Sequence, residues 1–254
     1  MRVEGHRGAG HLETENTLRA FRRAIELGLD GVEVDVWLTK DKVPVVVHGL
    51  FGGNVEFKNH KEKITQIDFK ALAKSKYTLK NGEKIQSLAK VLDICKGKID
   101  LNIEMKDPNQ AVIEQVLSLV KSKTMINQVS FSSFHHSLRK KLSQEVSKRK
   151  LHSPVNFGFL MHSFKPVFPN YLEDTIPGDF LVIDIRYLKK YRDECLAEIE
   201  RARQHSVKVK FWFPMKHSNE DSYYEDLMSL EVDTIITNTP LDVIAFRQKN
   251  TGRV

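Results

Sequence analysis

The sequence predicts an α/β protein built as a TIM (β/α)8 barrel, with a small insertion after the second strand region. The length of 254 residues is typical of a single barrel of this kind. Eight short strand-like segments follow one another along the chain, and each leads into a helical pattern or into the insertion. The first two segments are joined by a helix, which makes a βαβ unit and requires parallel strands. We therefore expect one domain over residues 1–254.

The first strand is short, from Arg2 to Gly5, and the helix after it is expected from Thr17 to Leu27. Apolar residues recur in this stretch at the spacing of one helix face. Asn16 or Thr14 is suited to cap the start of the helix, and Gly28 is well placed to end it. The chain then returns to the sheet as the second strand.

The second strand carries two acidic side chains on one face. Val32-Glu33-Val34-Asp35-Val36 alternates strictly, so the two carboxylates point one way and the three valines the other. An unpaired charge buried in a core is very costly. We therefore expect something cationic to meet Glu33 and Asp35 inside the barrel.

The other strands are placed by similar patterns. From Ile99 to Lys106 the apolar residues take one face, and the polar ones, Asn102 and Glu104 among them, take the other. A short extended run, Val43 to Val47, ends at His48. The eight barrel strands are predicted to end at His6, Trp37, Lys106, Ser132, Met161, Asp184, Trp212 and Thr237. The later helices are predicted over 88–96, 110–121, 136–148, 194–205, 220–230 and 241–247.

The segment from residue 49 to about residue 87 is polar and has no long apolar period. A small helical pattern occurs from Asp68 to Lys74. We interpret the segment as an insertion on the rim of the barrel, because it is too short and too polar to bury a core of its own.

Composition narrows the function classes. The net charge of +7 is compatible with anionic substrates or membrane surfaces, and equally with a lysine-rich solvated exterior. No basic and aromatic stripe resembles a nucleic-acid-binding module, so no nucleic acid is expected as a partner. Cys95 and Cys195 do not belong to a metal-binding motif, and they suggest no disulfide. Because no signal-peptide pattern or membrane-length apolar run occurs, we expect a cytoplasmic location; the oligomeric state stays open.

Three carboxylates are expected to converge at the carboxyl ends of the strands, where this fold has its active site. They are Glu33, Asp35 and Glu104. Oxygen ligands alone suit a hard divalent cation, so the residues predict one Mg²⁺ or Ca²⁺ ion. The alternative is an interior salt-bridge cluster in which Arg7 and Lys106 neutralise the acids.

Two histidines differ from the others because each ends a strand-like segment beside the carboxylates. His6 and His48 on opposite sides of a bound phosphate suit general acid–base catalysis, and the residues do not decide which of them is the base. Arg7 and Lys106 would face the same anion. Phosphodiester cleavage needs this set of groups.

The motifs occur in a characteristic series: His6-Arg7-Gly8, Glu15-Asn16-Thr17, Glu33-x-Asp35, His48 and Glu104-x-Lys106. In order and spacing they resemble the glycerophosphodiester phosphodiesterase family. The resemblance implies the same barrel and metal-dependent cleavage, and places Glu15 in the polar shell of the site. It also implies that Trp212 lines the alcohol side of the pocket. Asn238 stands where the family usually has aspartate.

The resemblance implies hydrolysis of a small-molecule glycerophosphodiester to glycerol 3-phosphate and an alcohol. One alternative keeps the chemistry but takes lysophospholipids, as a lysophospholipase D. Another is a non-catalytic phospholipid- or phosphate-binding barrel. Direct attack by water and closure of a cyclic phosphate by a substrate hydroxyl both stay open.

The insertion carries many lysines with aromatic residues between them. Such a surface at the mouth of a barrel suits peripheral contact with an anionic membrane. The alternative is a solvated lid whose aromatic residues pack inward, with a soluble substrate, and we favour the lid. The basic residues are Lys58, Lys61, Lys63, Lys70, Lys74, Lys76, Lys80 and Lys84, and the aromatic ones are Phe51, Phe57, Phe69 and Tyr77.

Overall fold

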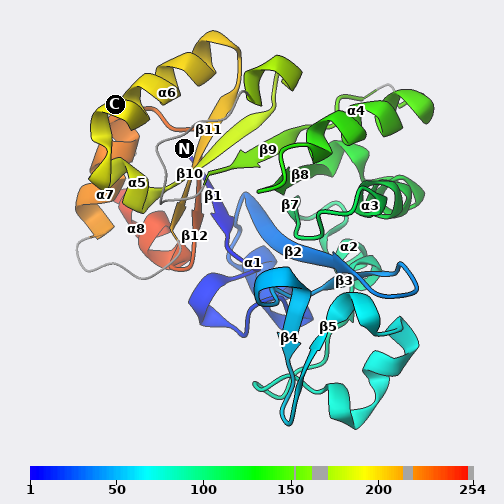
Figure 1. The fold of residues 1–254 in the computed structure, drawn as a ribbon. Helices are drawn as coiled ribbons and strands as arrows, with labels where there is room; N and C mark the ends of the chain where they lie inside the picture. The colour runs from blue at the N-terminus through cyan, green and yellow to red at the C-terminus, as the bar shows by residue number, and fades with distance from the viewer. Residues whose placement is uncertain (152, 162–170, 214–219, 251–254) are drawn as a thin grey trace.

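The structure, a computed structural model, describes residues 1–151, 153–161, 171–213 and 220–250. Eight parallel strands form a closed barrel, because β1 pairs with β12 on one side and with β2 on the other (Figure 1). The fold is thus the predicted TIM barrel. Its strands are β1 (Arg2–Gly5), β2 (Gly31–Leu38), β7 (Asp100–Met105), β8 (Val129–Ser133), β9 (Phe157–Leu160), β10 (Phe180–Asp184), β11 (Lys208–Phe213) and β12 (Thr234–Thr237).

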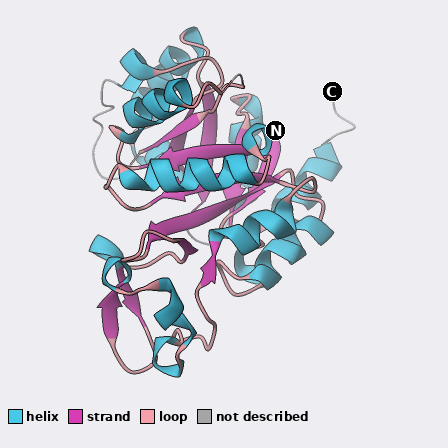
Figure 2. Cartoon of the chain, turned by 90° about the vertical axis from the view of Figure 1, so that its right-hand side faces the viewer, coloured by secondary structure: helices cyan, strands magenta, loops and turns pink. Residues whose placement is uncertain are grey.

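Helices pack around the outside of this barrel (Figure 2). They are α1 (Leu18–Glu26), α2 (Leu88–Cys95), α3 (Ala111–Ser122), α4 (Leu138–Lys148), α5 (Ile185–Lys190), α6 (Arg192–Gln204), α7 (Glu220–Ser229) and α8 (Pro240–Asn250). The strand ends lie within one residue of those predicted. The short helix α5 is missing from the sequence prediction, because its 6 residues are too few to show a helical period. No helix in the described ranges is long and apolar enough to cross a membrane.

The cap predicted for α1 is wrong. Thr17, not Asn16 or Thr14, occupies the N-cap position, and its hydroxyl accepts a hydrogen bond from the backbone N–H of Ala20. Asn16 instead has a positive φ of 57° and turns its amide away from the helix. The side chain of Asn16, which resembles a helix cap in the sequence, donates its hydrogen bond to Asp35 inside the barrel.

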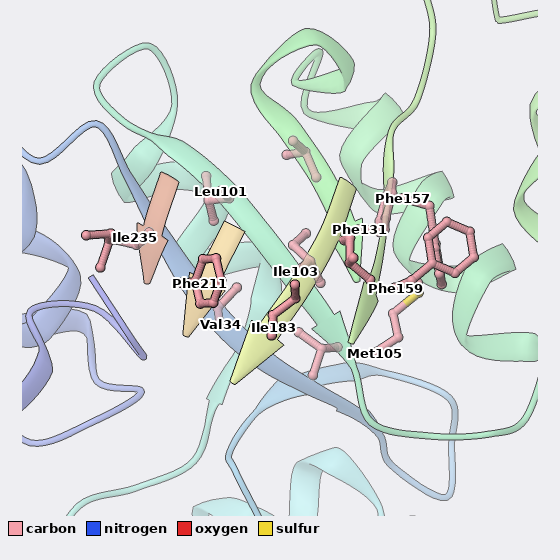
Figure 3. Close-up of a cluster of buried hydrophobic side chains, with 14 of the residues drawn as sticks. Val34, Leu101, Ile103, Met105, Phe131, Phe157, Phe159, Ile183, Phe211 and Ile235 are labelled. Carbon is pink, nitrogen blue, oxygen red and sulfur yellow. The ribbon is translucent and has the colours of Figure 1, made fainter. Parts of the chain in front are cut away.

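The main core lies between the strands and the helices. Figure 3 shows the outward-facing residues of neighbouring strands in this layer, including Val34, Ile103, Phe131 and Phe211. Each is buried, and burial of such a side chain stabilises the fold by ~1.5–3 kcal/mol. Because side chains alternate along a strand, the residues between them point into the barrel, where the polar groups gather.

The insertion forms a lobe at one end of the molecule (Figures 1 and 2). β3 (Pro44–Val46) pairs antiparallel with both the end of β2 and β6 (Gln86–Ser87), and β4 (Asn54–Glu56) pairs with β5 (Lys61–Lys63). The short 3-10 helix Phe69–Ala73 occupies the predicted helical pattern.

The expectation that the insertion is too polar to bury a core is wrong. Phe57 and Tyr77 pack against each other in a cluster that also contains Trp37 from the end of β2. The apolar residues are scattered along the segment without a period, so only the tertiary fold brings them together. The buried members are Trp37, Val45, Val47, Val55, Phe57, Ile64, Ile67, Leu72, Tyr77 and Ile85.

Candidate active site

A cavity of about 130 Å³ opens at the carboxyl ends of the strands. Charged and polar side chains from β2, β7 and β8, and from the residues that follow β1, β3 and β7, line one side, and mostly apolar side chains on or directly after β9 to β12 line the other. Except for Asp35 and Glu15, every predicted site residue lines it. The lining residues are His6, Arg7, Glu33, His48, Asn102, Glu104, Lys106, Ser132, Phe134, Leu160, Met161, Val182, Trp212 and Ile236.

The three predicted acids meet at this cavity. Asp35 on β2 and Glu104 on β7 are register partners, and Glu33 lies one inward position earlier on β2. One carboxylate oxygen from each residue lies within 4.8 Å of the others. Burial and the neighbouring carboxylates raise the pKa of Glu33 well above its ordinary value, and burial raises the pKa of Glu104 to about 7. The acids therefore repel one another at neutral pH.

Two cations lie against this cluster. Nε of Arg7 is 3.0 Å from Oδ2 of Asp35, and Nζ of Lys106 is 3.5 Å from its Oδ1. Lys106 also pairs with Oε1 of Glu104 at 2.7 Å. Burial acts to raise the pKa of Asp35, but the two cations outweigh it and hold that pKa below its ordinary value. Two positive charges thus face three acids.

The site fits a divalent cation. Oε1 of Glu33 is buried and accepts no hydrogen bond among the described residues, and Oδ1 of Asp35 has only the ion-pair contact with Nζ of Lys106 at 3.5 Å. Buried oxygens of this kind normally have a partner. Because all three groups offer hard oxygen ligands, Glu33, Asp35 and Glu104 together can hold one Mg²⁺ or Ca²⁺ ion. The salt bridges of Lys106 use Oδ1 of Asp35 and Oε1 of Glu104 but leave Oε1 of Glu33 unused, so salt bridges and a bound ion can coexist in this cluster.

The backbone positions Arg7 through an uncommon conformation. Its φ is 55°, and its backbone N–H donates to Oε2 of Glu33 at 3.1 Å. Gly8 follows because a Cβ there would lie 2.7 Å from Cβ of Ala20. Glu15 pairs with Nη1 of Arg7 at 2.6 Å and lies outside the cavity lining. Glu15 therefore holds the guanidinium of Arg7 by an ion pair on the side away from the cavity.

His6 is buried, and its Nδ1 is held by a hydrogen bond. Its Nδ1 lies 2.8 Å from Oδ1 of Asn238, and its Nε2 lies 3.8 Å from Oε2 of Glu33. Nδ2 of Asn238 donates to the carbonyl of Phe213, which turns the amide oxygen toward His6. The amide oxygen can only accept, so Nδ1 carries the proton and Nε2 has a free lone pair. Burial, followed by the charge of Arg7, lowers the pKa of His6 to about 3.

His48 reaches the cavity from the turn that follows β3. Its backbone carbonyl accepts a hydrogen bond from Nε1 of Trp37 at 3.1 Å, which ties this turn to the end of β2. Gly49 has a φ of 67°, so the chain turns away from the cavity at once and enters the insertion. Burial lowers the pKa of His48. His48 is the more exposed of the two histidines.

Trp212 and Phe134 belong to the apolar wall. Trp212 contacts His6 edge to face, with 5.5 Å between ring centroids, and Nζ of Lys106 lies 5.8 Å from the centroid of Phe134. They pack against an inner cluster of buried apolar residues that includes Leu160 and Val182. The wall faces the charged groups across the cavity.

Several residues of the site were not predicted as such. Asn16 donates to Oδ2 of Asp35 at 2.9 Å, although its sequence position suggests a helix cap. Asn238 holds His6 from a loop at the far end of the chain. Asn102 and Ser132 line the cavity, and strand alternation marks both as inward-facing. That alternation is the only sequence signal for the last two.

Comparison with known proteins gives a consistent result. The family model described as "Glycerophosphoryl diester phosphodiesterase family" matches residues 6–242. A glycerophosphodiester phosphodiesterase of Caldanaerobacter subterraneus subsp. tengcongensis is 32% identical over 196 residues, which cover 69% of this chain and 79% of that protein.

Solved structures share the fold. The structure of a glycerophosphodiester phosphodiesterase from Thermotoga maritima has a TM-score of 0.72 at 24% identity, covering 97% of this chain and 98% of the other. A phosphodiesterase of Oleispira antarctica, solved in complex with the product sn-glycerol-3-phosphate, has a TM-score of 0.74 at 20% identity, with 98% and 97% covered.

Proposed function

This chain belongs to the glycerophosphoryl diester phosphodiesterase family, and we propose that it cleaves small glycerophosphodiesters to glycerol 3-phosphate and an alcohol. It is an enzyme, a phosphodiesterase. One observation carries the proposal: two histidines, two cations and two of the three clustered acids line a single cavity, and the third acid lies against them. A non-catalytic barrel would not need two histidines placed beside this cluster.

In this proposal Glu33, Asp35 and Glu104 hold one Mg²⁺ or Ca²⁺ ion. Once bound, the ion would polarise the phosphoryl oxygens and offset negative charge in the transition state. Lys106 and Arg7 bind the same phosphate, Lys106 as a point charge and Arg7 through its planar fork. The unpaired Oε1 of Glu33 supports the assignment of the ion to this cluster.

We assign His6 as the general base. Asn238 holds the proton on Nδ1, so Nε2 is free to take a proton from the attacking hydroxyl group. His48 then gives a proton to the oxygen of the leaving alcohol. The assignment is the same whether the attacking hydroxyl belongs to water or to the substrate, because both must lose a proton.

The test is an assay of the purified protein with glycerophosphocholine and glycerophosphoethanolamine, with either Mg²⁺ or Ca²⁺, in which both products are identified. We expect glycerol 3-phosphate and the free alcohol, and no turnover in excess EDTA. Glu104→Gln should lose activity and lose the thermal stabilisation by the cation together. Glu26→Gln, on an exposed part of α1, is the matched control. Undiminished turnover in EDTA, or phosphocholine as a product, would contradict the proposal.

A further inference from the structure

A second cavity opens at the opposite mouth of the barrel, at the amino ends of the strands. Its volume is about 490 Å³, within the roughly 300–1,000 Å³ of typical ligand pockets and larger than the active-site cavity of about 130 Å³. An inner apolar cluster divides the two: Val182 and Ile236 line the active site, and Phe180 lines the second cavity. In the described part of the chain the two cavities share no lining residue. The second cavity is therefore a separate space.

A buried ion pair forms the floor of this second cavity. Glu4 on β1 and Lys210 on β11 both line it, and Nζ of Lys210 lies 2.6 Å from Oε1 of Glu4. Glu4 is 5% exposed and Lys210 is 7% exposed. Gly31 on β2 is the register partner of Glu4, and a Cβ there would lie 2.9 Å from Cγ of Glu4. The neighbouring strand thus leaves room for this acid inside the barrel.

The ion pair leaves one acceptor and one donor unfilled. Oε2 of Glu4 is buried and has no hydrogen-bond partner among the described residues. An ammonium group has three hydrogens, and Lys210 uses one for Glu4 and presents its charge to the ring of Phe180, 4.0 Å from the centroid. No further hydrogen bond joins Nζ to a described residue. Buried polar atoms normally have a partner, so these positions call for water or a ligand.

The charges select an uncharged partner. Glu4 and Lys210 neutralise each other, so a cation near Oε2 would also meet the ammonium, and an anion near Nζ would also meet the carboxylate. Arg2 and Asp100, at the wall of the cavity, are paired as well, at 2.6 Å. A hydroxyl group both donates and accepts, so one hydroxyl can fill both open positions. Hydrogen bonds to charged groups are also the stronger ones.

The walls offer neutral polar groups for further hydroxyls, from Asn127, Ser130, Asn156 and Thr234. We propose that the amino-terminal mouth of the barrel is a second binding site, which takes a small uncharged compound with several hydroxyl groups, of the size of a cyclitol or a monosaccharide. The ion pair on the floor holds one hydroxyl of this ligand, and the walls hold the others. The proposal does not depend on the reaction at the other mouth.

The test is ligand-observed saturation-transfer NMR with the purified protein and three probes at millimolar concentration: myo-inositol, D-glucose and D-ribose. Cyclohexanol is the matched probe, because it keeps the six-membered carbon ring of myo-inositol and has a single hydroxyl. We expect at least one of the three polyols to bind and cyclohexanol not to bind. Failure of all three, or equal binding of cyclohexanol, would overturn the proposal.

The double variant Glu4→Leu/Lys210→Met tests the floor. Replacing both partners of a buried ion pair by apolar residues of similar volume is often tolerated, so the variant should melt cooperatively and still cleave glycerophosphocholine. Loss of charge-assisted hydrogen bonds should weaken polyol binding at least about tenfold. Lys208→Gln, at the exposed rim of the same mouth, is the control and should bind as the wild-type protein does. Full binding by the double variant, or loss of binding in the control, would contradict an uncharged ligand on this floor.

Ser130→Cys gives a second test that leaves the ion pair intact. Ser130 is half-buried at this mouth, whereas Cys95 and Cys195 are fully buried, so a thiol reagent can be directed to position 130. Modification with a bulky methanethiosulfonate should abolish polyol binding, and the bound polyol should slow the modification. Undiminished binding by the modified protein would place the ligand elsewhere and overturn the proposal, even if the double variant does not fold.

Discussion

Nδ1 of His6 lies 2.8 Å from Oδ1 of Asn238, and the two residues are 232 positions apart in the chain. The contact joins the loop after the first barrel strand to the loop after the last. It selects the tautomer of His6 and leaves Nε2 open toward the cavity. A neutral amide does this without adding a charge, so burial and Arg7 keep the pKa of His6 low, at about 3.

Asn238→Asp should therefore change the pH dependence of the enzyme. A carboxylate at this distance favours the charged imidazole and raises the pKa of His6, as opposite charges nearby do. His6 must be neutral to act as the base, so the acidic limb of kcat/KM should move to higher pH by roughly one to three pH units. A pH profile of both proteins measures the shift. Asn127→Asp, at the opposite mouth of the barrel, should show none. An unmoved limb would remove His6 from the role of base.

The two histidines should respond differently to the leaving group. Each alanine variant should lose ~10²–10⁴ in kcat on glycerophosphocholine. p-Nitrophenolate leaves without being protonated, so His48→Ala should retain most of its activity on a p-nitrophenyl phosphodiester, and His6→Ala should not. Steady-state kinetics on both substrates decide this. The opposite pattern would exchange the two roles, and a rise in KM alone would make the histidines phosphate-binding groups.

The acids should make the stability of the ion-free protein depend on pH. The pKa of Glu104 is raised from 4.5 to about 7 in the folded state, so its contribution is full below pH 4.5 and is lost as the pH rises through 7. His6 and His48, whose pKa values are lowered, act in the opposite direction over part of this pH range, so the quantity to measure is the difference in melting temperature between the wild-type protein and Glu104→Gln in EDTA. Relative to the variant, the wild-type protein should lose stability between pH 5 and pH 8. Saturating Mg²⁺ or Ca²⁺ should remove this relative loss. A difference that stays constant over this range in EDTA would contradict a raised pKa at Glu104.

The insertion should not hold the protein on membranes. Phe57 and Tyr77 are buried in its core and are not available to a membrane. The exposed surface of the insertion therefore offers mainly its lysines. Some of these lysines are already paired, as Lys61 and Lys80 are with Glu56. We expect no sedimentation with vesicles of anionic lipid at physiological salt. Binding that falls with salt, and falls again when Lys58, Lys63, Lys70 and Lys74 are changed to Gln, would show instead a membrane-facing surface.

The sequence by itself determined the barrel fold and the convergence of the three acids at one mouth of the barrel. Strand alternation is a local property with a period of two, so it fixes which side chains of β2 and β7 face inward wherever the strands lie. Parallel strands of a barrel present their carboxyl ends at one mouth, so Glu33, Asp35 and Glu104 had to converge there. The repeated strand and helix patterns predicted the carboxyl end of each barrel strand to within one residue.

Only the tertiary structure decided which groups touch. Closure of the barrel brings Asn238 to His6, and no periodicity in the chain encodes a contact over that separation. The positive φ of Asn16 turns an apparent helix cap toward Asp35. The insertion buries apolar residues that have no period, because its turns gather them against Trp37. Alternation shows that Asn102 and Ser132 point inward, but their lack of a partner depends on what every neighbouring strand places around them.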